Sequence, residues 1–288
     1  MKNNLKISIL LSYMSMFVSI IVSMLYTPFM LRHLGQQQYG LYNMAASVIS
    51  YLNLFDLGLG NAVVRYATKY RIEKKYKDAE YLYGMFVTIF ALISVLTMII
   101  GAILVVNIQN IYTVSTGETG IAQLRIIMII MIFSLAISFP GSVYSSIITS
   151  YEEFTFLKIT GMMSTILNPI IMIPLLIHGH KAVSLSVVAL SLNFFLISLN
   201  AIYVHTKLKV KIRFGRFDRN LLKEISRYSA FVFLGAIVDQ LYWNTDKIIL
   251  GVVSGEAAVA VYSVGSQMHT YVQQVSWSIS NVFFPRVT

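Results

Sequence analysis

The sequence LYTPFMLRHLG, residues Leu25–Gly35, ends a long apolar segment and leads on to Tyr42. A weak copy, LYWNTDKIILG at Leu241–Gly251, follows 216 residues later and leads on to Tyr262 after a four-residue insertion. Membrane transport proteins are often built from duplicated halves. The two stretches therefore predict that the chain begins a second structural repeat near residue 241.

Apolar runs long enough to cross a bilayer recur along the whole chain. The 288 residues are 57% hydrophobic and 12% charged, whereas about 25% of the residues of soluble proteins are charged. A membrane-spanning helix needs about 20 apolar residues. We expect eight spans, at residues 9–31, 41–63, 84–106, 125–148, 157–177, 182–204, 229–251 and 258–282. The sequence thus predicts an all-α, polytopic membrane helical bundle of about eight transmembrane helices.

The net charge of +10 reflects membrane topology rather than nucleic-acid binding. Of the 22 Lys and Arg residues, 18 lie at the amino terminus, between alternate pairs of spans or near the carboxyl end. The positive-inside rule then puts both chain ends in the cytoplasm. The absence of cysteine excludes disulfides, thiol catalysis and thiolate metal sites. Four basic residues fall outside or within the membrane: Arg32, Arg125, Lys181 and Lys247.

The spans divide into two unequal groups. Residues 1–206 form an expected six-helix lobe, and residues 229–288 hold the first two helices of a second, incomplete lobe. Between them, residues 207–228 form a basic cytoplasmic linker with an interfacial amphipathic helix on anionic lipid; a solvated basic loop is the alternative. We expect the chain to be part of a longer protein, with a complete eight-span protein as the alternative. The apolar face of that helix consists of Phe217, Leu221, Leu222 and Ile225.

Polar stripes run along spans one, two and eight, with polar residues three or four positions apart. Such stripes face either neighbouring helices or a hydrated cavity. For the serine stripe of span one, which includes Ser23, both remain open. The amides of span eight, Gln267 and Gln274, are expected to face a cavity, because amide groups in lipid would remain unpaired. The stripe of span two consists of Asn43, Ser47, Ser50 and Asn53.

A charged residue inside a membrane span costs free energy, so such residues usually mark a transport pathway or an ion pair. Asp239 lies near the middle of span seven, and Asp246 follows seven residues later on the same helix face, with Lys247 beside it. The pattern favours either a proton or sodium site or a structural pair with a cation of another helix. Both interpretations stay open.

The stretch FDLGLGNAVVR places Asp56 and Arg65 nine residues apart, with Gly58 and Gly60 between them. On a straight helix the two charges would lie on opposite faces, but the glycines can bend the chain. We expect Asp56 to orient this bend. Arg65 either meets a phosphorylated lipid at the inner mouth or is simply the first positive-inside residue. The GLG sequence lacks the preceding strand and the full GxGxxG pattern of a nucleotide loop.

Pro28 lies inside span one, where it removes a backbone hydrogen bond and is expected to kink the helix. Kinked spans suit a structure that opens to both sides, although static bundles also contain them. The loop HGHK, residues His178–Lys181, offers metal ligands without a third one nearby, so no metal site is predicted. No catalytic residue and no cofactor are predicted.

Three groups of motifs carry a resemblance to a known family: PFMLRHLG followed by YGLY, then FDLGLGNAVVRYATKY, then NTDKIILG ahead of AVY. They resemble the lipid-linked oligosaccharide flippases (Wzx type) of the multidrug/oligosaccharidyl-lipid/polysaccharide (MOP) exporter superfamily, and the resemblance runs over the whole chain in order. Members have twelve to fourteen spans in two six-span lobes. The resemblance therefore implies a partial MOP/MATE-like fold.

The resemblance also implies a function, the movement of an undecaprenyl-diphosphate-linked oligosaccharide from the cytoplasmic to the outer leaflet of the bacterial inner membrane. The cargo would be an O-antigen, capsule or exopolysaccharide unit, and the drive the membrane potential, protons or sodium ions. Expected partners are this lipid-linked oligosaccharide, membrane lipids and polysaccharide polymerase or assembly proteins. Cations would hold the diphosphate, and the candidates are Arg32, Arg65, Arg125 and Lys247.

We expect the ionic side chains to surround one hydrated groove between the two lobes. Arg32 and the Asp246–Lys247 pair occupy matching places in the two repeats, which predicts that Arg32 and Asp246 approach each other when the outer side is closed. The alternatives are a cation-coupled multidrug antiporter, which would have an acidic cavity, and a partial chain that needs further helices to function. A polyprenol-dependent glycosyltransferase would need a long outer loop or catalytic carboxylates, and the longest outer loop has Glu118 as its only acid.

Overall fold

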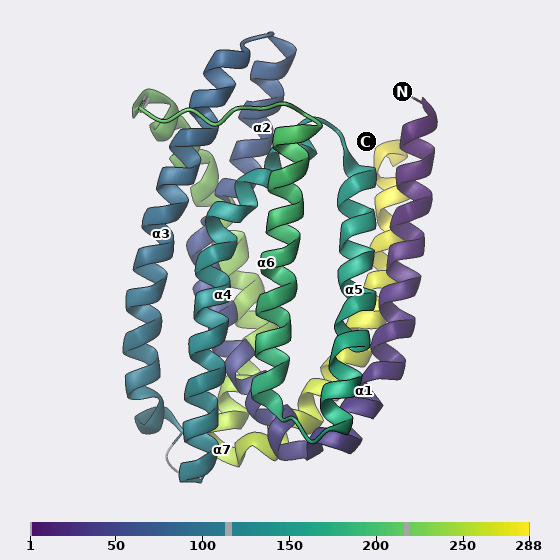
Figure 1. Cartoon of the computed structure of the whole chain (residues 1–288), viewed down its shortest axis with the longest axis vertical. Helices are drawn as coiled ribbons and strands as arrows, with labels where there is room; N and C mark the ends of the chain where they lie inside the picture. The colour runs from purple at the N-terminus through teal and green to yellow at the C-terminus, as the bar shows by residue number, and fades with distance from the viewer. Residues whose placement is uncertain (1, 113–116, 216–218, 288) are drawn as a thin grey trace.

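The computed structural model describes residues 2–112, 117–215 and 219–287, and this part of the chain contains helices and no strands (Figure 1). The predicted all-α fold is therefore confirmed. In chain order the elements are α1 (Lys2–Leu52), η1 (Asn53–Asp56), α2 (Leu59–Ile72), α3 (Tyr76–Ile111), α4 (Glu118–Ser150), α5 (Phe154–Ile177), α6 (Ala182–Thr206) and α7 (Arg219–Val287).

Helices α1 and α7 each reverse direction at one glycine. The backbone leaves helical geometry at Gly35 (φ 74°, ψ 166°) and at Gly255 (φ 80°, ψ −176°), a conformation that is essentially restricted to glycine. Figure 1 shows both helices turning back at the same end of the bundle. Within the described residues six helices are long and apolar enough to cross a membrane. Because two of them cross twice, the chain makes the eight predicted passes and is a multi-pass membrane protein.

The two ends of the bundle differ in composition. We call one the basic end: it holds both chain termini and the connections that follow α2, α4 and α6 (Figure 1). The opposite kink end holds Gly35 and Gly255. The lysines and arginines of residues 69–77 and 207–213 therefore gather at the basic end.

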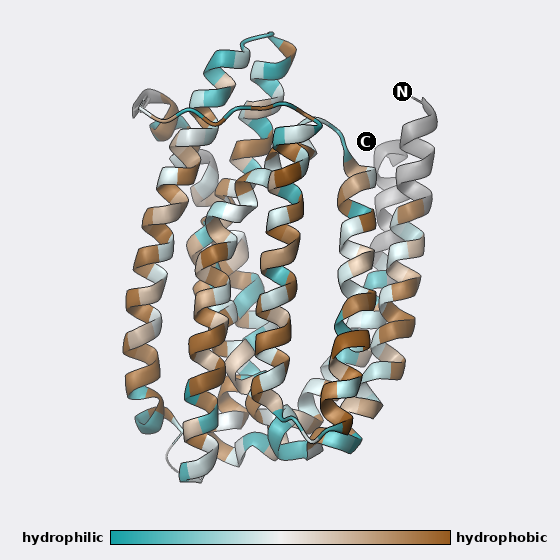
Figure 2. Cartoon of the chain, in the orientation of Figure 1, coloured by the Kyte–Doolittle hydropathy of each residue, from teal (hydrophilic) through white to brown (hydrophobic). Residues whose placement is uncertain are grey.

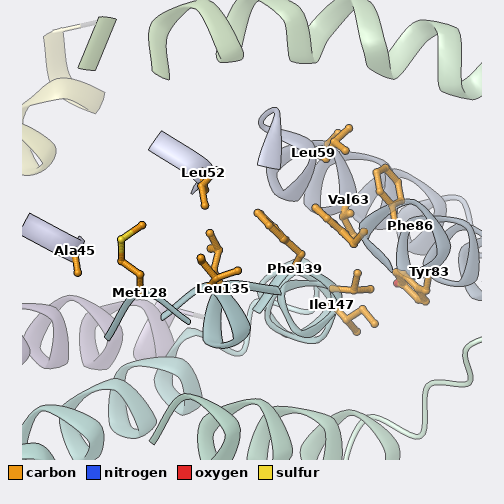
Figure 3. Close-up of a cluster of buried hydrophobic side chains, with 14 of the residues drawn as sticks. Ala45, Leu52, Leu59, Val63, Tyr83, Phe86, Met128, Leu135, Phe139 and Ile147 are labelled. Carbon is orange, nitrogen blue, oxygen red and sulfur yellow. The ribbon is translucent and has the colours of Figure 1, made fainter. Parts of the chain in front are cut away.

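The main core lies between the second half of α1, α2, α3 and α4 (Figure 3). Phe86 and Phe90 of α3 are fully buried, and Phe90 stacks on Phe139 of α4 with ring centroids 6.3 Å apart. Lipid tails are as apolar as these side chains, so close packing holds membrane helices together. Close packing is visible at Gly101, where an added Cβ would lie 2.8 Å from side-chain atoms of Ile132.

The outer surface of the bundle is apolar along its middle. Figure 2 shows hydrophobic residues along α3 and hydrophilic residues in the connections at both ends. Such a surface suits contact with acyl chains. The exposed apolar side chains of α3 include Leu92, Val95, Ile99, Ile103 and Val106.

The connection from α6 to α7 is fixed across the basic end of α3. Its residue Arg213 donates its backbone N–H to the carbonyl oxygen of Glu80 at 3.0 Å, and its Nε lies 2.6 Å from Glu80 Oε2. Gly84 allows this approach, because a Cβ there would lie 2.0 Å from the carbonyl oxygen of Arg213. Within its described residues the linker is therefore attached to the bundle.

The described residues of the predicted interfacial helix form the first turns of α7. Ile225 is fully buried there, and Leu221 packs against the main core, so part of the predicted apolar face contacts protein. An interfacial position of this segment on anionic lipid stays a prediction. Arg216 and Phe217 lie outside the described residues.

Candidate functional site

A polar seam joins the first half of α1 to the second half of α7. Thr27 Oγ1 donates to Gln267 Oε1 at 3.1 Å, and Gln267 Nε2 donates to Ser23 Oγ. Tyr271 donates its hydroxyl to the same Ser23 Oγ at 2.9 Å. Ser23 of the span-one stripe and Gln267 of span eight thus hydrogen-bond to each other. Gln267 therefore contacts a neighbouring helix, whereas the sequence pattern indicated that it faces a cavity.

A second polar cluster joins the other two halves of the same helices. Gln240 Nε2 donates to the carbonyl oxygen of Ser50 at 2.6 Å, and Asn244 Nδ2 donates to Gln240 Oε1 at 2.5 Å. Tyr51 OH lies 2.7 Å from Thr245 Oγ1. The sequence interpretation missed Gln240, Tyr51 and Thr245 as seam residues, since a polar stripe does not say which helix it meets.

The bend before α2 is held by the Asp56 carboxylate, which accepts hydrogen bonds from the backbone N–H groups of Gly58 and Gly60. Leu57 and Gly58 both adopt the left-handed conformation. The first N–H groups of a helix have no partner within the helix, so the carboxylate satisfies a donor of α2. Gly58 also lies against α7, because an added Cβ would be 2.6 Å from Val232 Cγ1.

A cavity of about 380 Å³, which we call the bend pocket, lies between this bend and α7. Residues of the bend form one wall, and residues of the first half of α7 form the other. The lining side chains include Asn53, Asp56, Asn61, Val232, Ala236 and Gln240.

A second cavity of about 620 Å³, the aromatic pocket, lies between the two halves of α7. Trp243 and His269 meet in it with ring centroids 5.2 Å apart. Tyr262 donates its hydroxyl to Asp246 Oδ2. The aromatic pocket thus combines a carboxylate with several aromatic faces.

The predicted phosphate-binding cations are spread over several elements. Arg32 is exposed near the kink of α1, and Arg65 is exposed on α2 with its guanidinium carbon 6.0 Å from the Tyr66 ring centroid. Arg125 of α4 is partly buried and donates to Gln109 Oε1 at 3.2 Å. None of them, nor the half-buried Lys247, lines the bend pocket or the aromatic pocket.

The predicted aspartates are also separated. Asp246 lines the aromatic pocket, whereas Asp239 is exposed on α7 and lines neither cavity. The expected groove with all ionic residues is therefore not formed by these two pockets. In the described part of the chain Arg32 and Asp246 form no ion pair. Ion pairs at the basic end include Arg71–Glu152, Lys75–Glu73 and Arg213–Glu80.

Two further features concern single residues. The helical backbone of α1 continues through Pro28 and breaks at Gly35, so the reversal of this helix is made by the glycine. At the basic end the hydrogen bond from Lys75 lowers the pKa of Glu73, and the same contact raises the pKa of Lys75. The Gln274 side chain is half-buried in the second half of α7.

The six membrane-spanning helices of the described residues, two of them reversed at a glycine, and the polar seam between α1 and α7 define a multi-pass helical membrane protein. A model of the family described as "Polysaccharide biosynthesis protein" matches residues 5–288, and the chain belongs to this family. No relative was found among curated proteins.

Solved transporter structures share the fold. The MATE multidrug transporter DinF-BH is 15% identical, with a TM-score of 0.76, and the match covers 98% of this chain and 64% of that one. An inward-facing multidrug resistance MATE family transporter of the MOP superfamily is 16% identical, with a TM-score of 0.71, over 91% and 61% of the two chains.

A MOP superfamily transporter from Pyrococcus furiosus, whose reversed binding-pocket polarity suggests a different function, is 14% identical with a TM-score of 0.60, over 96% and 64% of the chains. This chain therefore spans less than two thirds of the length of these transporters.

Proposed function

We propose that the protein moves an undecaprenyl-diphosphate-linked oligosaccharide from the cytoplasmic to the outer leaflet of the bacterial inner membrane. The observation that carries the proposal is the match of a polysaccharide biosynthesis family to residues 5–288 of a chain with a transporter fold. The basic end is the cytoplasmic one, with the amino terminus, as the positive-inside rule requires. The cargo is an O-antigen, capsule or exopolysaccharide unit.

The charge distribution supports an anionic cargo. Arg65 is exposed on α2 near the basic end, where the diphosphate of a lipid in the inner leaflet would lie. Guanidinium groups bind phosphate oxygens in a bidentate manner. A membrane potential that is negative inside favours outward movement of an anion by about 2.3 kcal/mol per charge per 100 mV. Arg32, Arg125 and Lys247 are further phosphate-binding candidates along the route.

The seam supports a movement of one repeat against the other. Its contacts are hydrogen bonds between uncharged side chains, such as Thr27 to Gln267 and Tyr51 to Thr245. In membranes such bonds contribute about 0.6 kcal/mol on average, so they can exchange with water without a large barrier. Asp246 and Asp239 are the candidates for coupling this movement to protons or sodium ions.

Transport in proteoliposomes tests the proposal. The cargo is a fluorescent undecaprenyl-diphosphate-linked oligosaccharide, and the measurement is its loss of protection from a membrane-impermeant quencher. We expect Arg65→Gln to slow transport about 10-fold or more, since a charge-assisted hydrogen bond contributes about 1.5–3 kcal/mol. The matched control is Lys69→Gln, an exposed cation one turn further along α2, which should leave the rate unchanged. An intact protein that moves no lipid-linked glycan contradicts the proposal.

A second candidate is a cation-coupled multidrug antiporter. The aromatic pocket favours it, because aromatic faces beside the Asp246 carboxylate suit an organic cation. Ethidium efflux from cells that express the gene separates the two functions. Efflux that disappears in Asp246→Asn, together with no movement of the lipid-linked glycan, would establish the antiporter instead.

A further inference from the structure

The bend pocket contains two amide side chains with no protein partner among the described residues. Asn53 and Asn61 line the pocket and are exposed, and neither amide hydrogen-bonds to the protein in the part of the chain that the structure describes. Both belong to the second membrane pass. An amide at membrane depth that meets neither protein nor lipid headgroups needs water or a polar ligand.

Two further groups of the pocket retain hydrogen-bonding capacity. The Asp56 carboxylate accepts two backbone N–H groups, whereas an ionised carboxylate offers about four acceptor sites. Gln240 is held in place by Ser50 and Asn244, and one of its two N–H donors remains for a ligand. The pocket therefore presents amide donors, amide acceptors and a carboxylate acceptor around one space.

The pocket lies beside the proposed phosphate contact. Asn61 and Arg65 are four residues apart on α2, so they share a helix face about 6 Å apart along the axis, and both are exposed. Arg65 is the one nearer the basic end. A ligand that spans both positions would place its anionic part at Arg65 and its other part in the bend pocket.

The chemistry of the pocket selects a neutral, hydroxyl-rich ligand. Each sugar hydroxyl both donates and accepts, which matches paired amide and carboxylate groups. The negative Asp56 disfavours a phosphate in the same space. The volume of about 380 Å³ falls in the range of pockets that hold small molecules.

We propose that the bend pocket binds a neutral pyranose ring of the transported glycan, while Arg65 holds the phosphate to which the glycan is linked. This inference rests on the proposed function and assigns its substrate-recognition site. Asn53 and Asn61 donate hydrogen bonds to the ring hydroxyls and accept hydrogen bonds from them, and the Asp56 carboxylate accepts further hydrogen bonds from these hydroxyls. The bend pocket thus recognises the sugar hydroxyls, and Arg65 recognises the negative charge of the phosphate.

Saturation-transfer NMR on the whole chain in nanodiscs tests the site directly. The probes are the methyl glycosides of glucose, galactose and N-acetylglucosamine, none of which carries a phosphate. We expect saturable binding of at least one of them. The double variant Asn53→Leu/Asn61→Leu should weaken that binding about tenfold or more, since each lost neutral hydrogen bond weakens binding roughly two- to tenfold. The control Asn107→Leu, an exposed asparagine of α3, should bind as the wild type does.

A second variant keeps the test decisive if the double variant does not fold. Ala236→Leu fills the pocket from the α7 side and removes no polar group, and it should also abolish the sugar signal. Retained helical circular dichroism and a single elution peak establish the fold of each variant. The inference is overturned if no glycoside binds saturably, or if the correctly folded variants bind like the wild type.

The test separates this inference from the proposed function. Sugar binding is measured on free glycosides and involves no transport. If both pocket variants move the lipid-linked glycan at wild-type rates, the proposed function is supported and sugar recognition by the bend pocket is contradicted. If the bend pocket binds sugar but the protein moves no glycan, sugar binding in the pocket is supported and the proposed function is contradicted.

Discussion

Gly40 of α1 lies directly against the main chain of Glu256 in α7. A Cβ added to Gly40 would lie 1.9 Å from the Glu256 carbonyl oxygen. Glu256 follows the kink residue Gly255, and Gly40 follows the kink residue Gly35 by five positions. The two reversals therefore contact each other at the kink end, and the contact depends on the missing side chain.

We expect Gly40→Ala to destabilise the protein, because the new methyl group forces two backbones apart. Overpacking of this kind typically costs about 1–3 kcal/mol. The measurement is the free energy of unfolding in mixed micelles. Gly161→Ala is the matched control, since no atom lies within 4 Å of its added Cβ on α5 and alanine favours the helix by about 1 kcal/mol. Equal stabilities of the two variants would disprove the contact.

Gly35→Ala tests the backbone conformation of the kink separately from packing. Nothing lies within 4 Å of a Cβ at Gly35, yet its φ is +74°. We expect a loss of about 1–3 kcal/mol from backbone strain alone. Thermal unfolding, measured beside the same Gly161→Ala control, gives the value. A Gly35→Ala protein as stable as that control would show that the kink does not need this dihedral angle.

The hydrogen bond from Thr27 to Gln267 predicts a measurable coupling between α1 and α7. A double-mutant cycle with Thr27→Val and Gln267→Leu should give a coupling energy of about 0.6 kcal/mol, and at most about 1.7 kcal/mol. Thr165, whose hydroxyl bonds within its own helix α5, supplies the control cycle with Gln267 and should show no coupling. Independent effects of Thr27 and Gln267 would argue against the seam.

Gly84→Ala should release the connection between α6 and α7 from α3. The added methyl group would overlap the carbonyl oxygen of Arg213, so the segment 207–215 would have to move away. Detached connections are preferred sites of proteolysis. We expect trypsin to cleave this basic segment several times faster in Gly84→Ala than in the wild type, with Gly161→Ala unchanged. Unaltered cleavage would mean that the segment is not held by this contact.

The passes could be predicted from the sequence because runs of about 20 apolar residues alternate with basic connections. Which helices pack against each other could not be predicted from the sequence. Ser23 and Gln267 each lie on a polar stripe, but a stripe indicates only that some polar partner or water is required. Their hydrogen bond joins positions 244 residues apart, and no local pattern encodes such a distance.

The candidate site was predictable only in part for the same reason. Asp56, Gly58 and Gly60 are close in sequence, and their bend follows from local geometry. Asp246 lies beside Tyr262, a contact that the repeat does not indicate, and its approach to Arg32 when the outer side is closed stays a prediction. Asn61 was missed, although its place four residues before Arg65 puts both on one helix face.

The reversals at Gly35 and Gly255 join two membrane crossings through a single residue instead of a slack loop. Each pair of crossings is therefore joined by a rigid connection. When one helix of a pair tilts at the basic end, the other helix tilts with it. The contact between Gly40 and Glu256 then transmits this tilt from one helix pair to the other. A mechanical linkage of this kind would couple a movement at the basic end of one helix pair to the helices of the other pair.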